Sequence, residues 1–137
     1  MEEFSNFKMN EHIMDRKELI RLRPQVLIDN TDFTSSIEQF QNNSLRPIIK
    51  FQHDLIIELV TTNVLFNALK KDKGPRLEFQ KKVRRFIIGQ VALKNQLIGF
   101  ITGNMTLSEF DFYLKKQREI NKRITDMICQ RISDTLY

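Results

Sequence analysis

The hydrophobic pattern is clearest in the last third of the chain. Apolar side chains recur there at intervals of three and four, the spacing of a helix that buries one face. They are Leu107, Phe110, Leu114, Ile124, Met127, Ile128 and Ile132. Just before them, Thr106 and Glu109 have the spacing of a capping box, in which each side chain bonds the other residue's backbone amide. The pattern therefore predicts a helix over residues 106–135.

The middle of the chain predicts a short helix followed by a long one. Thr34 or Ser35 can cap the short helix, which is expected to stop near Asn42 and Asn43. Ser44 is suited to cap the next helix, and Pro47 falls in its first turn, where a missing amide hydrogen does no harm. We expect that second helix over residues 45–71.

A third helix is predicted after the breaker Lys73-Gly74-Pro75, which ends one helix and suits the start of another. This helix is expected over residues 76–102. Without a break, Lys94 would lie in the centre of its apolar stripe, so the pattern predicts a kink at residues 92–95. Nothing in the main body alternates in the manner of a strand.

These patterns predict an all-α fold, a bundle of three long helices over 45–71, 76–102 and 106–135 with short N-terminal helices. Residues 1–32 lack sustained periodicity. We expect them to form an irregular arm packed on the bundle or on a second subunit, and residues 33–137 to form the helical bundle domain.

Composition favours one folded domain in a reducing compartment. The chain has 137 residues, 41% of them hydrophobic and 28% charged, which is ordinary for a globular domain. A single cysteine cannot close an intrachain disulfide, and the acidic opening lacks the pattern of a signal peptide, so we expect a cytoplasmic protein. The stretch from Phe86 to Met105 is interrupted by polar residues, which argues against a membrane span.

The protein is basic, with a net charge of +5, and the excess lies in one segment. Residues 70–94 carry nine basic and two acidic groups, so the remainder totals −2. Within the segment, Glu78 is expected to pair with Lys82, which leaves Lys81, Arg84 and Arg85 without close acidic partners. The exposed face of Lys81, Lys82, Arg84 and Arg85 predicts either an ordinary solvated surface, which we favour, or a site for nucleic acid or an acidic partner.

Five side-chain amides fall on the apolar faces of the predicted helices: Gln52, Asn63, Gln90, Gln117 and Asn121. A buried amide without a hydrogen-bond partner costs about 1 to 3 kcal/mol, so these groups are expected to bond one another, water or a ligand. An interhelical network is the favoured interpretation. The alternative is a small-molecule pocket or a metal-independent enzyme site between the helices, although amides suit binding better than proton transfer.

Arg46, Lys50 and His53 share another face of the second predicted helix, at spacings of four and three. Two cations and an imidazole near a helix N-terminus are suited to hold a phosphate or a carboxylate. The simpler interpretation is a solvated helix face.

Metal and nucleophile chemistry find little support in the sequence. The histidines are His12 and His53, in segments that are not expected to meet, and Cys129 lies at the edge of an apolar face, where packing is its expected role. We therefore predict no metal site, no cofactor and no catalytic residue, and the enzyme question stays open with a preference for a non-enzyme.

Two segments resemble small all-helical bacterial proteins of unknown function, some of which carry the label glyoxalase. They are Leu45-Arg46-Pro47-Ile48-Ile49-Lys50-Phe51-Gln52-His53-Asp54-Leu55 and Asn121-Lys122-Arg123-Ile124. The resemblance covers roughly residues 35–135 and implies a helical fold. The residues do not support the label, because glyoxalases of both main types are metalloenzymes with histidine and carboxylate ligands.

The leading functional hypothesis is a helical interaction module that self-associates as a dimer. It depends on the second and fourth predicted helices, each of which would be about 40 Å long, more than a minimal bundle needs. The alternatives are binding of a polyanion or nucleic acid by residues 70–94, and a small-molecule pocket at the amides.

Overall fold

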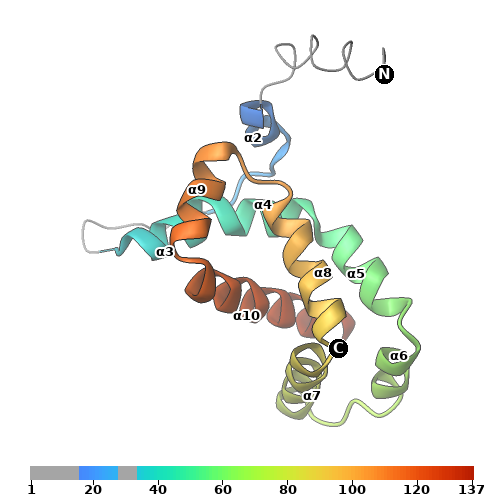
Figure 1. Cartoon of the computed structure of the whole chain (residues 1–137). Coiled ribbons are helices and arrows are strands. Elements are labelled where there is room, and N and C mark those ends of the chain that lie inside the picture. Colours follow the sequence, from blue (N-terminus) through green and yellow to red (C-terminus); the bar gives the residue numbers. More distant parts are fainter. Residues whose placement is uncertain (1–15, 28–33) are drawn as a thin grey trace, which may run out of the picture.

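The computed structural model describes residues 16–27 and 34–137, and this part of the chain contains helices and no strand. The predicted all-α bundle is therefore confirmed (Figure 1). Its elements are η2 (Arg16–Glu18), α2 (Leu19–Leu22), α3 (Ser36–Phe40), η3 (Gln41–Leu45), α4 (Arg46–Phe51), α5 (His53–Thr61), α6 (Val64–Lys70), α7 (Arg76–Gly89), α8 (Val91–Thr102), α9 (Leu107–Lys115) and α10 (Gln117–Leu136).

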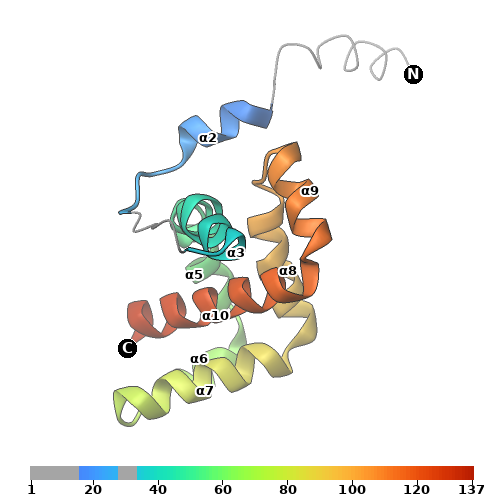
Figure 2. The same cartoon turned by 90° about the vertical axis from the view of Figure 1, so that its left-hand side faces the viewer.

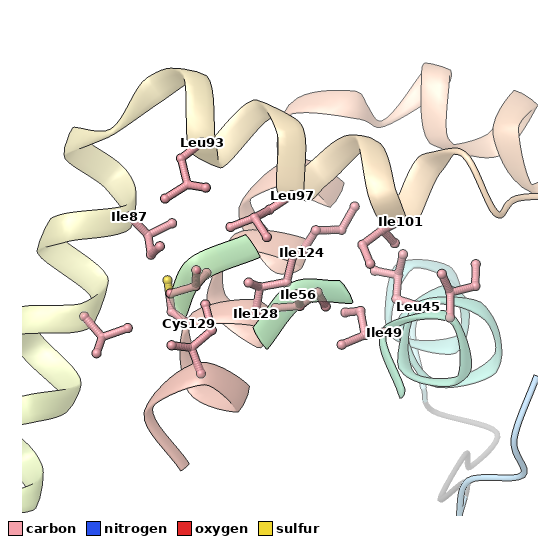
Figure 3. Close-up of a cluster of buried hydrophobic side chains, with 14 of the residues drawn as sticks. Leu45, Ile49, Ile56, Ile87, Leu93, Leu97, Ile101, Ile124, Ile128 and Cys129 are labelled. Carbon is pink, nitrogen blue, oxygen red and sulfur yellow. The ribbon is translucent and has the colours of Figure 1, made fainter. Parts of the chain in front are cut away.

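Helix α10 is the centre of the bundle. It lies between the α4–α5 segment and α7, and it contacts α5, α7, α8 and α9 (Figure 2). Its isoleucines at 120, 124, 128 and 132 are buried one turn apart. Ile124 and Ile128 meet Ile56 of α5 and Leu97 and Ile101 of α8 in the core (Figure 3). Each such side chain contributes about 1.5 to 3 kcal/mol by leaving water.

The chain passes from α3 to α4 through a wide turn instead of a break. In η3 the helix is π-helical, and the Arg46 N–H donates to Gln41 O, five residues back. Ser35 caps α3 as predicted. The predictions that the helix stops near Asn42 and restarts at a Ser44 cap are wrong, because the π turn accommodates an extra residue while backbone hydrogen bonding continues. Ser44 is buried inside this turn.

The predicted helix over residues 45–71 is divided twice. Gln52, with φ −88° and ψ 6°, bends the chain between α4 and α5. Asn63 is extended, and its Oδ1 accepts from the Phe66 N–H at 3.1 Å to cap α6. Asparagine favours this N-cap position, so a polar residue that we assigned to a helix interior instead starts a new helix. The uninterrupted helix was a wrong prediction.

The other two long helices are divided once each. Gln90 separates α7 from α8, just before the kink predicted at residues 92–95. The last helix starts with the predicted capping box, in which Thr106 Oγ1 accepts from the Glu109 N–H and the Glu109 carboxylate accepts from the Thr106 N–H. It is not continuous, because Lys116, with φ −127°, separates α9 from α10.

The described part of the N-terminal arm packs on the corner between α8 and α9. Arg16 Nε donates to Met105 O at 2.9 Å. Arg23 donates twice to the Glu109 carboxylate, at 2.7 and 2.8 Å, and once to Asn104 O at 2.8 Å. Two arginines thus anchor this part of the arm. Residues 1–15 and 28–33 lie outside the described residues.

The Arg23–Glu109 pair is buried. The side chains are 5% and 13% exposed. Burial alone raises the pKa of Glu109, but hydrogen bonds from Arg23, Ser44 and Thr106 and the charge of Arg23 outweigh it and lower the pKa from 4.5 to about 2. The carboxylate is therefore charged at neutral pH, and its ion pair with Arg23 stabilises the fold.

Candidate functional site

A groove of about 740 Å³ runs between α4 and α10, with Val26 of the arm at its edge. Five cationic side chains line it: Arg46 and Lys50 from α4, and Lys122, Arg123 and Arg131 from α10. We call this the α4–α10 groove. Two of the three predicted anion-site residues thus lie in one cavity, and α10 adds cations that the sequence analysis did not group with them.

Amide and imidazole side chains contact the three arginines of the α4–α10 groove. The contacts are Arg46 Nε to Asn42 Oδ1 at 2.9 Å, Arg123 Nη1 to Gln41 Oε1 at 2.8 Å, and Arg131 Nη1 to His53 Nδ1 at 3.2 Å. Because a guanidinium can only donate, His53 Nδ1 is the acceptor in its contact with Arg131. These partners orient the guanidinium groups of Arg46 and Arg131 without an ion pair among the described residues, whereas Arg123 also pairs with Glu119.

The carboxylates of the α4–α10 groove already have cationic partners. The pairs are Glu119 with Arg123 at 3.7 Å, Asp126 with Arg84, and Asp134 with Arg76 at 3.5 Å. Arg84 and Arg76 belong to α7 and lie outside the groove. Within residues 16–27 and 34–137, no carboxylate forms an ion pair with Arg46, Lys50, Lys122 or Arg131.

A smaller cavity of about 320 Å³ lies on the other side of α10, against α7 and α8. We call it the α8–α10 cavity. Its charged lining residues are Arg84, Lys94, Arg118, Lys122 and Asp126. Lys122 and Asp126 line the α4–α10 groove as well, so the two hollows adjoin along α10.

The predicted basic face of α7 is only partly joined to these cavities. Of Lys81, Lys82, Arg84 and Arg85, the α8–α10 cavity includes Arg84 alone. Lys81 Nζ lies 3.9 Å from the Glu78 carboxylate, and Lys82 donates to Asp72 O at 3.0 Å. The predicted Glu78–Lys82 pair was therefore wrong, as was the expectation that Lys81 and Arg84 lack acidic partners.

The predicted convergence of five amides on one interior is also wrong. Gln52 Nε2 donates to Phe100 O at 2.9 Å, and Asn121 Oδ1 accepts from the Tyr113 hydroxyl at 2.6 Å. Asn63 caps α6, Gln90 stands at the α7–α8 junction, and Gln117 is exposed at the start of α10. Backbone breaks and nearby donors place each amide separately, so they form no common network or pocket.

Cys129 packs in the core, as its position predicted. Burial raises the pKa of its thiol to about 11, so the nucleophilic thiolate is disfavoured at neutral pH. Across the described ranges, no group of three His, Cys, Asp or Glu side chains is placed to hold a metal ion. No described helix combines the length and apolar character needed to cross a bilayer.

Comparison with known proteins adds no relative: no family model, curated protein or solved structure matches this chain. The resemblance to glyoxalase-labelled helical proteins stays a prediction. Function must therefore be argued from the two cavities and their charges.

Proposed function

We propose that the protein binds a multiply charged anion, of the phosphoryl type, in the α4–α10 groove. The observation that carries this proposal is that an amide and an imidazole, and not carboxylates, orient Arg46 and Arg131. A planar guanidinium forms paired hydrogen bonds with phosphate or carboxylate oxygens, and such charge-assisted bonds are stronger than neutral ones. Prior orientation lowers the entropy that binding costs.

The origin of the cations supports a binding groove over an ordinary solvated face. A solvated face needs only one helix, whereas this groove combines residues 46–50 of α4 with residues 122–131 of α10. Lys50 Nζ also lies 3.4 Å from Gln25 O, which ties the arm to the groove. Like charges from separate segments repel one another unless an anion lies between them.

Calorimetric titration with sodium tripolyphosphate tests the proposal. We expect binding by the native chain, and about a tenfold or greater loss of affinity in Lys50→Glu/Arg131→Glu, because two charge-assisted contacts are removed. The matched control is Lys81→Glu/Arg85→Glu, which changes net charge equally at residues outside both cavities. An equal loss of affinity in both variants would mean that net charge alone causes the effect, and would reject the α4–α10 groove as the binding site.

Self-association is a second candidate, through α9, which lies within the predicted helix 106–135. Leu107, Phe110 and Leu114 form a stripe on α9 and are 74%, 38% and 52% exposed. Asp111 and Lys115 lie on the same helix, so antiparallel pairing of two α9 helices would bring opposite charges together.

Sedimentation equilibrium at about 50 µM, a concentration at which a micromolar dimer is populated, tests this second candidate. We expect a dimer that Leu114→Glu dissociates, while Leu77→Glu, at an exposed position of α7, leaves it intact. A monomer in the native chain would reject self-association and would leave the anion groove unaffected.

We also propose a cytoplasmic location, supported by the single cysteine in the chain. Such a compartment contains phosphorylated metabolites and nucleic acids, so both kinds of anion are within reach of the groove.

A further inference from the structure

The α8–α10 cavity needs an explanation that a small anion in the α4–α10 groove does not supply. It contains Lys94 and Arg118, for which the described residues provide no ion-pair partner. A ligand that occupies only the α4–α10 groove would not contact Lys94 or Arg118. The inference below rests on the proposed anion function and extends it across α10.

Positive charge exceeds negative charge in the lining of both cavities. Together the two cavities are lined by eight basic and three acidic residues of the described chain. The described lining therefore carries a net charge of +5. A localised positive field of this kind draws in polyanions and releases their counterions.

The position of α10 between the two cavities indicates the shape of a ligand that contacts both of them. Lys122 and Asp126 line both cavities, which makes this part of α10 the ridge that separates them. An α-helix with its side chains is about 10 to 12 Å across, and the major groove of a DNA duplex is about 12 Å wide. A duplex has two phosphate strands along such a groove, one for each side of the ridge.

We propose that this face binds a nucleic-acid duplex through its phosphate backbone, with α10 facing a groove and one phosphate strand in each cavity. Arg46, Lys50 and Arg131 contact one strand, and Lys94 and Arg118 contact the other. Lys122 lies between them on the ridge.

The uncharged lining supports backbone contact with a duplex. It includes Gln41 and Asn95, whose side-chain amides are of the type that donates to phosphate and sugar oxygens. Neither cavity has an aromatic ring among the described residues that line it. Proteins that bind single strands rely on such rings to stack bases, so the lining favours a duplex. Binding is expected to depend little on sequence.

Fluorescence anisotropy with a labelled duplex of about two helical turns tests the inference, against one of its single strands and against a polyglutamate peptide. We expect the duplex to bind at least about tenfold tighter than either competitor, with affinity falling steeply between about 50 and 200 mM salt. Equal or tighter binding of the single strand or of polyglutamate would overturn the duplex proposal.

Charge-neutralising variants then test the two sides separately. Lys94→Gln/Arg118→Gln should reduce the slope of log affinity against log salt by about 2, because each lost phosphate contact removes about one unit. The same variant should bind tripolyphosphate as the native chain does. Lys50→Gln/Arg131→Gln should weaken the binding of both the duplex and tripolyphosphate. The control Lys81→Gln/Arg85→Gln should weaken the binding of neither.

The results distinguish the two proposals. A duplex slope that Lys94→Gln/Arg118→Gln does not change, with tripolyphosphate still bound in the α4–α10 groove, overturns the duplex inference and keeps the anion function. Failure of the native chain to bind tripolyphosphate overturns the anion function itself.

Discussion

Arginine has opposite roles at the arm corner and in the α4–α10 groove. At the corner, Arg23 is buried and its charge is matched by Glu109 at 2.7 Å. In the groove, Arg46 and Arg131 contact the Asn42 amide and the His53 imidazole instead of a carboxylate. A buried pair loses stability when one partner is removed, whereas an oriented but unmatched cation contributes little to folding. The charge partner, more than the hydrogen bond, distinguishes a structural arginine from one available to a ligand.

The largest effect is expected from breaking the arm corner. Arg23→Ala leaves the Glu109 carboxylate buried without its charge partner and should lower the free energy of unfolding by about 3 to 5 kcal/mol. Urea unfolding followed by circular dichroism measures this value. Arg21→Ala is the control, because its pair with Glu18 is 80% and 53% exposed and should contribute less than about 1 kcal/mol. Similar losses in both variants would contradict the comparison.

Acid should remove the contribution of the same pair. The pKa of Glu109 is about 2 in the folded chain and 4.5 ordinarily, so its stabilisation is full above about pH 5.5 and is lost as pH falls toward 2. The loss should amount to about 3 kcal/mol. Unfolding measured from pH 7 to pH 3 should show a weaker acid dependence in Glu109→Gln. An unchanged profile in that variant would assign the dependence to other carboxylates.

The smallest change in stability is expected in the groove. Arg131→Ala should alter the free energy of unfolding by less than about 0.5 kcal/mol, because no ion pair is lost and repulsion from neighbouring cations is relieved. Its affinity for tripolyphosphate should nevertheless fall. Urea unfolding and calorimetry of one preparation measure both quantities. A loss near that of Arg23→Ala would make Arg131 structural and weaken the proposed function.

Local chemistry explains which parts of the fold could be predicted. The Thr106–Glu109 capping box and the left-handed Gly74, with φ +66°, depend on neighbouring residues, and both stand where the sequence indicated a helix start and a breaker. The breaks at Gln52 and Lys116 carry no proline or glycine. Gln52 Nε2 donates to Phe100 O, 48 residues further along the chain, and a periodic pattern does not contain such a contact.

The candidate site was predictable only within one helix. Arg46 and Lys50 are four residues apart, so their common face follows from helical periodicity. Arg123 pairs with Glu119 four residues back in α10, but its contact with Gln41 spans 82 residues. Tertiary packing brings α10 beside α4. The cations of the two helices therefore line one groove.

The wide turn in η3 makes the arginine contacts sensitive to chain length. Gln41 contacts Arg123, and Asn42 contacts Arg46, and both lie in the turn that contains one residue more than an α-helical turn. Loss of the exposed Asn43 would restore ordinary helical winding and turn the preceding residues by about 100° relative to α4. An insertion or deletion within these five residues should therefore disturb ligand recognition more than any single substitution there.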